Sequence, residues 1–178
     1  MRTFGPAAFA GLLLAATPAA ALTITSTDIS DGGTIAEVQV QKDCKGKNIS
    51  PAVSWSGVPK QAKSLAVTLW DKDVAGGYWH WIVFDIPTTT TSLPSGAGNK
   101  KSKTLPAGAV IGANSYGNME YSGPCPPAGQ KPHHYQLTIW GLDVPVVDPM
   151  YAGNAIWFAS YLHQHSVDKA VLTGVYGR

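Results

Sequence analysis

The sequence predicts a mainly β domain, with helical structure confined to the C-terminal part of the chain. Two runs, Leu65–Trp70 and Trp81–Ile86, are almost entirely apolar. Such runs are typical of central strands that are covered on both faces of a sheet. The chain also contains 19 Gly and 13 Pro among its 178 residues, and many of them stand between short alternating segments. Because both residues interrupt regular structure, this pattern favours strands joined by turns.

Shorter segments on either side of these runs complete the expected fold. Four of them have the alternation or the β-former content of strands: Leu22–Ser26, Thr34–Val40, Ala52–Trp55 and Tyr135–Trp140. Residues 88–108 are rich in Thr, Gly and Lys, and they are expected to form one long loop. Asn154–His163 lacks Gly and Pro and has apolar residues at helical spacing, which predicts a helix. A second short helix is expected at Val167–Leu172.

The first 21 residues have the layout of a secretory signal peptide. Arg2 supplies a positive charge, Ala7–Ala16 is an apolar run, and Ala19–Ala21 provides a small-residue cleavage site. The apolar run is shorter than the roughly 20 residues of a membrane-spanning helix, although a retained anchor is the alternative. Cleavage after Ala21 would leave residues 22–178 as a single domain. The sequence therefore predicts a periplasmic or secreted protein without stable membrane insertion.

Charge argues against nucleic acid as a partner. The formal net charge is only +2, whereas binding to a phosphate backbone needs a clustered basic face. The one basic cluster in the sequence is Lys100, Lys101 and Lys103, which is interpreted as a solvated loop tip.

The predicted export determines how the two cysteines, Cys44 and Cys125, are interpreted. A disulfide is the first expectation in an oxidising compartment, and two free thiols are the alternative. Closing a loop of about eighty residues would stabilise the fold by roughly 4–5 kcal/mol in the chain-entropy model.

A proline-rich segment leads into the strand predicted at Tyr135–Trp140. Residues 121–135 read YSGPCPPAGQKPHHY, and their four prolines fix φ and exclude a helix. This stiff loop delivers His133, His134 and Tyr135 to the start of the strand. The segment is either a rigid connection with a surface histidine pair or the mouth of a pocket.

A second polar cluster lies between the two apolar runs. Asp71 directly follows the first run, Asp73 comes two residues later, and His80 directly precedes the second run. A strand-loop-strand hairpin brings residues 71 and 80 close together, at a sheet end where ligands are often bound. The alternative interpretation is that the aspartates are ordinary turn formers.

Three motifs together resemble one protein family. They are D-x-D at 71–73, Y-W-H-W at 78–81 and G-P-x-P-P-x-G-x-x-x-H-x-Y at 123–135. This combination is similar to the phosphatidylethanolamine-binding protein family, which includes the Raf kinase inhibitor proteins, and most similar to its bacterial branch. The resemblance covers nearly all of residues 22–178. It implies a large antiparallel sheet packed on a smaller one, C-terminal helices, and a small anion-binding pocket.

The resemblance also implies a set of ligand-binding residues: Asp71, Asp73, His80, Gly123, Cys125, Pro126, His133 and Tyr135. The chain departs from the family's D-P-D-x-P pattern, since Lys72 and Ala75 replace both prolines. His134 stands where an Arg is common, and Cys125 replaces a Gly of the eukaryotic relatives. These departures make the acidic wall of the expected pocket less rigid.

The chemistry of these residues predicts a phosphorylated or zwitterionic headgroup as ligand. The two histidines, the backbone N–H groups near Gly123 and Cys125, and the Tyr135 hydroxyl would donate to phosphate. Neighbouring carboxylates would raise the histidine pKa values and could accept an ammonium group. We therefore expect a binding protein without a cofactor or catalytic activity, which could also engage a protein partner.

Two other functions stay open at this level. A metal-dependent hydrolase could use Asp71, Asp73, His80 and His133 as ligands, although the chain has neither an H-E-x-x-H nor a G-x-S-x-G motif. A protease inhibitor or protein-interaction module could instead use the Lys100–Lys103 loop.

Overall fold

Two antiparallel sheets form the framework of the chain. The computed structural model describes residues 21–178, so the predicted signal peptide lies outside the described residues apart from Ala21. The larger sheet has the strand order β6 (Val110–Ile111), β4 (Tyr78–Ile86), β3 (Ser64–Asp71), β7 (His133–Leu142) and β8 (Ser166–Tyr176). The smaller sheet has the order β1 (Thr23–Thr25), β2 (Val53–Ser56) and β5 (Ser92–Leu93). The predicted fold class is confirmed.

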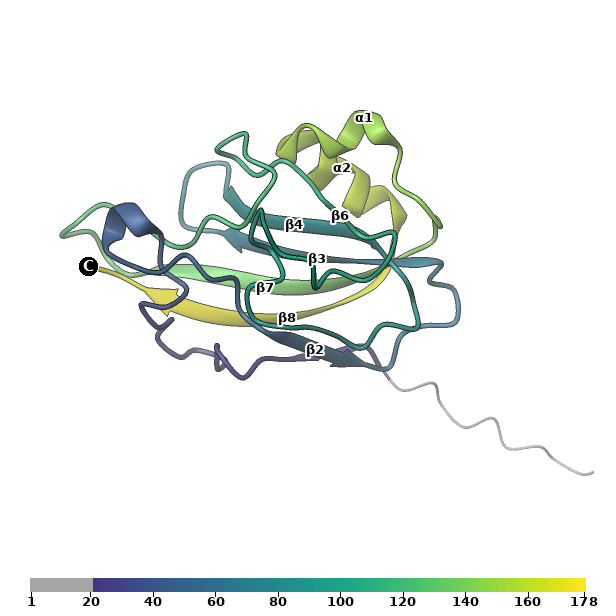
Figure 1. The fold of residues 1–178 in the computed structure, drawn as a ribbon, viewed down its shortest axis with the longest axis horizontal. Coiled ribbons are helices and arrows are strands. Elements are labelled where there is room, and N and C mark those ends of the chain that lie inside the picture. The colour runs from purple at the N-terminus through teal and green to yellow at the C-terminus, as the bar shows by residue number, and fades with distance from the viewer. Residues whose placement is uncertain (1–20) are drawn as a thin grey trace, which may run out of the picture.

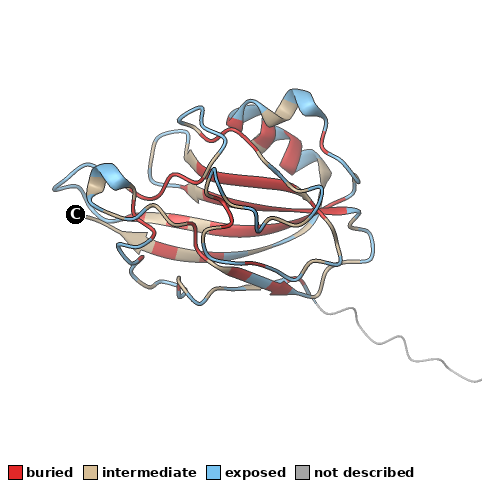
Figure 2. Cartoon of the chain, viewed as in Figure 1, coloured by how far each residue is buried: buried red, intermediate tan, exposed pale blue. Residues whose placement is uncertain are grey.

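The larger sheet is the middle one of three layers. Its first face packs on the smaller sheet through a cluster that includes Val67, Trp81 and Trp55. Its second face packs on α1 (Pro149–Ala152) and α2 (Ala155–His165), which lie above the sheet in Figure 1. The strands β3 and β4 are therefore buried along most of their length (Figure 2). Burial on both faces explains why these two strands are continuous apolar runs rather than alternating ones.

Two predicted elements are wrong. Thr34–Val40 is not a strand, because Thr34 makes only an isolated bridge to Val175 and turns follow it. Ile35 and Val40 are still buried, so packing of a loop produced the alternation. Val167–Leu172 is not a helix but part of β8, which pairs with β7 over its whole length. There, pairing with the edge of β7 determines the structure, since local propensity is a weak signal beside tertiary context.

The other predicted elements are present with shifted bounds. The helix predicted from Asn154 is α2, and the Asn154 side chain caps it by accepting hydrogen bonds from the backbone of Ile156 and Trp157. The strand expected from Tyr135 begins two residues earlier, at His133. The loop expected over 88–108 contains the two-residue strand β5. A short 3₁₀ turn, η1 (Lys42–Cys44), lies between β1 and β2.

One end of the larger sheet collects polar residues from three neighbouring strands. β3 ends at Asp71, which pairs with Tyr78 near the start of β4 and with Tyr135 near the start of β7. A register shift between Leu69 and Trp70 leaves His80 of β4 without a paired residue on β3, so His80 lies in a β-bulge near this same end of the sheet. Bulges commonly re-aim a side chain at a functional site. Within residues 21–178, no helix is long and apolar enough to cross a membrane.

Candidate functional site

A cavity of about 270 Å³ lies at this polar end of the larger sheet. Six of the eight predicted ligand-binding residues line it: Asp71, His80, Cys125, Pro126, His133 and Tyr135. The strands β3, β4 and β7 supply four of the six, and the proline-rich loop supplies Cys125 and Pro126. Segments about fifty residues apart in the chain therefore meet around one cavity.

Asp71 and His133 form a buried pair in the part of the cavity that β3, β4 and β7 build, which we call the strand wall; the part built by the proline-rich loop is the loop wall. The His133 Nδ1 lies 2.7 Å from the Asp71 Oδ2, and both residues are largely inaccessible to solvent. The second carboxylate oxygen of Asp71 accepts a hydrogen bond from the Asp73 backbone N–H at 2.9 Å. Both oxygens of Asp71 are thus engaged. The carboxylate orients the His133 ring and leaves Nε2 to face other partners, of which the Gln130 Oε1 lies 3.3 Å away.

His80 is the second buried imidazole, and its Nδ1 lies 2.7 Å from the Ser122 carbonyl oxygen. Since a carbonyl only accepts, Nδ1 carries the proton, and the neutral ring offers a lone pair at Nε2. Burial lowers the pKa of His80, even though the Ser122 backbone and the charge of Asp71 act in the opposite direction. The expectation that a neighbouring carboxylate raises the pKa is wrong for His80, because desolvation outweighs the charge.

Tyr135 contributes a buried hydroxyl that makes no well-formed hydrogen bond with the described residues. Its side chain is fully buried and lines the cavity, and within residues 21–178 its hydroxyl makes no well-formed hydrogen bond, although the Asp71 carboxylate acts on it as a nearby acceptor. Burial, followed by the charge of Asp71, raises the pKa of Tyr135, so its hydroxyl keeps its proton. An unpaired buried hydroxyl costs free energy that a bound oxygen atom would recover.

Asp73 and Gly123 do not line the cavity. Asp73 lies on the outer side, where its Oδ2 accepts hydrogen bonds from the His134 backbone N–H at 2.6 Å and binds the His134 Nδ1 at 2.8 Å. Burial acts to raise the pKa of Asp73, but these two bonds and the charge of Lys72 outweigh it and lower the pKa. The Gly123 N–H is also engaged, because it donates to the Asn48 Oδ1 at 2.8 Å. The prediction that this N–H donates to an anion is therefore wrong.

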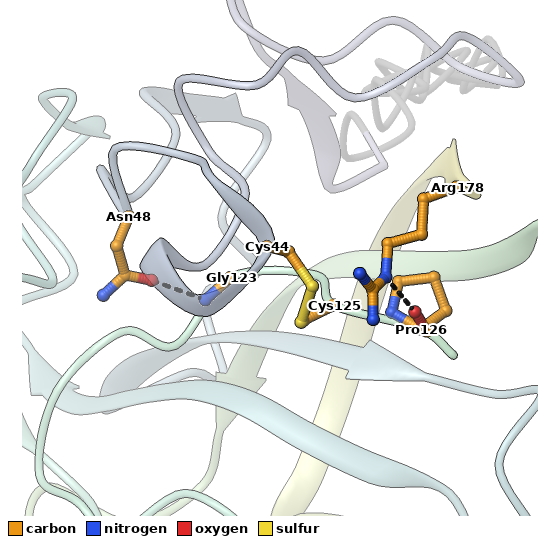
Figure 3. The surroundings of a disulfide bond; sticks show 6 residues. All are labelled: Cys44, Asn48, Gly123, Cys125, Pro126 and Arg178. Carbon is orange, nitrogen blue, oxygen red and sulfur yellow. Dashed lines mark hydrogen bonds between the residues drawn. A yellow bond between two sulfur atoms is a disulfide. The ribbon is translucent and has the colours of Figure 1, made fainter. Parts of the chain in front are cut away.

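The loop wall of the cavity is held by long-range ties (Figure 3). The predicted disulfide is present, and it joins Cys125 in this wall to Cys44 in η1, with the two Cα atoms 5.6 Å apart. The Arg178 Nε donates to the Pro126 carbonyl oxygen at 2.7 Å. A Cβ on Gly123 would overlap the Gln39 carbonyl oxygen, so only glycine fits beside this backbone.

Sequence reasoning missed the aromatic part of the lining. Tyr78 and Tyr116 both line the cavity and pack edge to face, with ring centroids 4.9 Å apart. Tyr78 was visible as the first residue of the Y-W-H-W motif. Nothing in the sequence pattern indicated Tyr116 as a lining residue, because its position depends on a turn that the buried Asn114 side chain holds. The Asn114 Oδ1 accepts hydrogen bonds from the backbone of Tyr116 and of Asn118.

The four residues considered as metal ligands do not form a common site. Asp73 faces away from the cavity, and the two oxygens of Asp71 are engaged by protein hydrogen bonds. In the part of the chain that the structure describes, no group of three or more His, Cys, Asp or Glu side chains is placed to hold a metal ion.

Comparison with known proteins agrees with this geometry. The family model described as phosphatidylethanolamine-binding protein matches residues 25–177. The chain belongs to this family. YbcL of Escherichia coli is 40% identical over 163 residues, which cover 89% of this chain and 88% of that protein. Its crystal structure, titled as a new member of the mammalian PEBP family, has a TM-score of 0.85 and covers 89% of this chain and 99% of that one.

Two further relatives widen the comparison. A Chlamydia trachomatis structure, titled as a homolog of the family and named CT736, has a TM-score of 0.73 at 30% identity and covers 89% of this chain and 98% of that one. A Mycobacterium tuberculosis protein named as lipoprotein LppC is 39% identical over 166 residues, which cover 91% of this chain and 77% of that protein. Family membership makes this chain a ligand-binding protein of the phosphatidylethanolamine-binding type.

Proposed function

We propose that this chain is an exported, non-catalytic binding protein whose cavity takes a small phosphate ester such as a phospholipid headgroup. One observation carries the proposal: within residues 21–178 the buried Tyr135 hydroxyl makes no well-formed hydrogen bond, and Tyr135 lines a cavity together with two imidazoles. A phosphate oxygen would accept its hydrogen bond and remove the free-energy cost of leaving a donor unpaired.

The two histidines favour a monoprotonated phosphate ester. His80 is neutral and offers a lone pair at Nε2, so it would accept a hydrogen bond from a protonated phosphate oxygen. His133, whose Nδ1–H donates to Asp71, would in its protonated form donate from Nε2 to a second phosphate oxygen. The backbone N–H of Cys125 has no acceptor within residues 21–178 and provides a further donor at the loop wall.

An ammonium group on the same ligand would suit the aromatic side of the cavity. The rings of Tyr78 and Tyr116, whose faces are electron-rich, line the cavity together with the carboxylate of Asp71. Cation–π contact at such a place contributes about 0.5–2 kcal/mol. A zwitterion such as phosphoethanolamine would therefore combine both kinds of contact.

Titration calorimetry with phosphoethanolamine and with inorganic phosphate tests the proposal. Tyr135→Phe, His133→Ala and His80→Ala should each weaken binding by roughly tenfold to a hundredfold, since a hydrogen bond to a charged group contributes about 1.5–3 kcal/mol. Tyr151→Phe in α1 is the matched control and should bind as the unaltered chain does. Affinities unchanged in all three cavity variants would contradict the proposal.

The pH dependence of binding gives a second arm of the same experiment. The second pKa of a phosphate monoester is about 6, and the singly protonated ester is the form that neutral His80 can bind. Affinity should therefore fall as pH rises from about 5.5 to 8. The fall should be smaller in His80→Ala, and an affinity that rises with pH would contradict the assigned role of His80.

Export is supported by two observations. Cys44 and Cys125 form a disulfide, which persists in oxidising compartments, and one relative is named as a lipoprotein. N-terminal sequencing of the protein from a periplasmic or culture-medium fraction should begin at Leu22. An N-terminus at Met1 in that protein would contradict cleavage after Ala21.

A further inference from the structure

A second cavity, of about 560 Å³, lies beside the first and is rich in lysine. Lys42 and Lys47 come from the segment around η1, and Lys100 and Lys101 come from the loop after β5. The two segments are joined by hydrogen bonds from the Asn99 side chain to the backbone of Asn48 at 2.6 Å and from Ser50 N–H to the Asn99 side chain at 3.4 Å. We call the four lysines with this cavity the lysine groove.

The positive charge of the lysine groove is unpaired. All four lysines are exposed, and within residues 21–178 none of them makes an ion pair with a carboxylate. The groove also contains Asp43 and Glu120, which reduce its excess to two charges. Lys45 and Lys103 belong to the same two segments and add to the positive potential. A formal net charge of +2 for the whole sequence thus hides a strongly polarised distribution.

A ridge of mostly exposed residues separates the lysine groove from the cavity lined by His80 and His133, which we call the ligand cavity. The ridge is residues 116–120, in which Tyr116 lines the ligand cavity while Asn118 and Glu120 line the groove. Tyr116 and Met119 are 43% and 54% exposed, although both are largely apolar. The two cavities are also linked through Ser122, whose carbonyl accepts from His80 while the residue lines the groove.

We infer that the lysine groove and the ridge are a docking surface for an anionic phospholipid bilayer. Lysines near a bilayer bind its phosphates, and aromatic and apolar side chains enter the headgroup region beside them. Docking in this way would put the mouth of the ligand cavity at the plane of the headgroups. The inference extends the proposed function, because it names a bilayer as the source of the ligand, but vesicle binding is measured independently of headgroup binding.

Co-sedimentation with vesicles of phosphatidylcholine containing phosphatidylglycerol, against vesicles of phosphatidylcholine alone, tests this inference. We expect binding to the anionic vesicles only, weakening as salt increases. Each lysine near the surface should contribute about fivefold to the partition coefficient. Lys100→Gln/Lys101→Gln should therefore reduce partitioning at least tenfold, and adding Lys42→Gln and Lys47→Gln should reduce it further.

A matched control removes the same charge elsewhere. Lys60 and Lys63 are exposed and precede β3, at the opposite end of that strand from Asp71. Lys60→Gln/Lys63→Gln should leave partitioning nearly unchanged. Met119→Ser should lower it severalfold with an unchanged salt dependence, since this variant removes an apolar contact rather than a charge.

Three results would overturn the inference. They are no binding to anionic vesicles at low salt, an equal loss of vesicle binding in the two double variants, or binding to soluble poly-glutamate without any binding to vesicles. The last result would assign the groove to an acidic macromolecule in solution. Calorimetry with phosphoethanolamine on the quadruple variant keeps the two proposals apart, because that variant should retain the affinity of the ligand cavity.

Discussion

The two walls of the ligand cavity are built by different physical means. The strand wall carries Asp71, His80, His133 and Tyr135 on the paired ends of β3, β4 and β7. The loop wall carries Cys125 and Pro126 on a segment without regular structure. Backbone ladders and a continuous core hold the first wall, whereas the disulfide and a few isolated hydrogen bonds, such as that from the Gln41 backbone N–H to the Pro124 carbonyl oxygen, hold the second. We conclude that stability and ligand geometry are coupled mainly through the loop wall.

Removing the disulfide should have the largest effect. Cys44→Ser/Cys125→Ser releases a constraint that spans 81 residues. The free energy of unfolding should fall by about 2–5 kcal/mol, as measured by urea denaturation. Affinity for phosphoethanolamine should also fall, because Cys125 belongs to the cavity lining. A double variant with unchanged stability and affinity would show that hydrogen bonds alone hold the loop wall.

Gly123→Ala should cause the second-largest loss in the free energy of unfolding. A methyl group at this position overlaps the Gln39 carbonyl oxygen and approaches the backbone of Val40 and Gln41, none of which is a flexible side chain. Crowding of this kind costs on the order of 3 kcal/mol. Thermal denaturation measures the loss. Gly129 lies in the same loop and has a positive φ, but it has open space around it. Gly129→Ala therefore measures backbone strain without crowding, whereas Gly123→Ala measures crowding.

His80 in the strand wall should give the smallest effect, visible as a pH dependence. Its pKa is lowered in the folded state, so the unfolded chain binds a proton more readily as pH falls below about 6.5. The free energy of unfolding should therefore decrease below that pH, by at most about 1.4 kcal/mol per pH unit from this group. Denaturation of His80→Asn at pH 7.5 and 5.5 should lack this contribution. An equal decrease in the variant would assign it to other groups.

Residues of both walls and the disulfide were predicted from the sequence, but the side-chain contacts that hold the loops around the cavity were not. Asp71 and His80 flank two apolar runs, so hairpin pairing alone places them at one sheet end. By contrast, the position of Tyr116 depends on the buried Asn114, and the engagement of the Gly123 N–H depends on Asn48, which is 75 residues away. Such side-chain ties leave no periodic pattern. For the same reason Val167–Leu172 was mistaken for a helix, since only pairing with β7 determines its structure.

The lysine groove illustrates the same limit for charge. The sequence shows Lys100, Lys101 and Lys103 as an isolated loop cluster beside a near-neutral total. Only the fold places Lys42 and Lys47 next to them. The small net charge correctly indicated that the surface is not uniformly basic. It could not reveal a local basic patch such as the lysine groove.

The central claim is that a phosphate ester binds between His80 and His133. Nitrogen-15 NMR of histidine-labelled protein during titration with phosphoethanolamine tests it most directly, with His163 and His165 at the end of α2 as internal controls. We predict saturable changes in the ring nitrogens of His80 and His133 and none in those of His163 and His165. Unchanged His80 and His133 signals at saturating ligand, or equal changes in all four residues, would contradict the account.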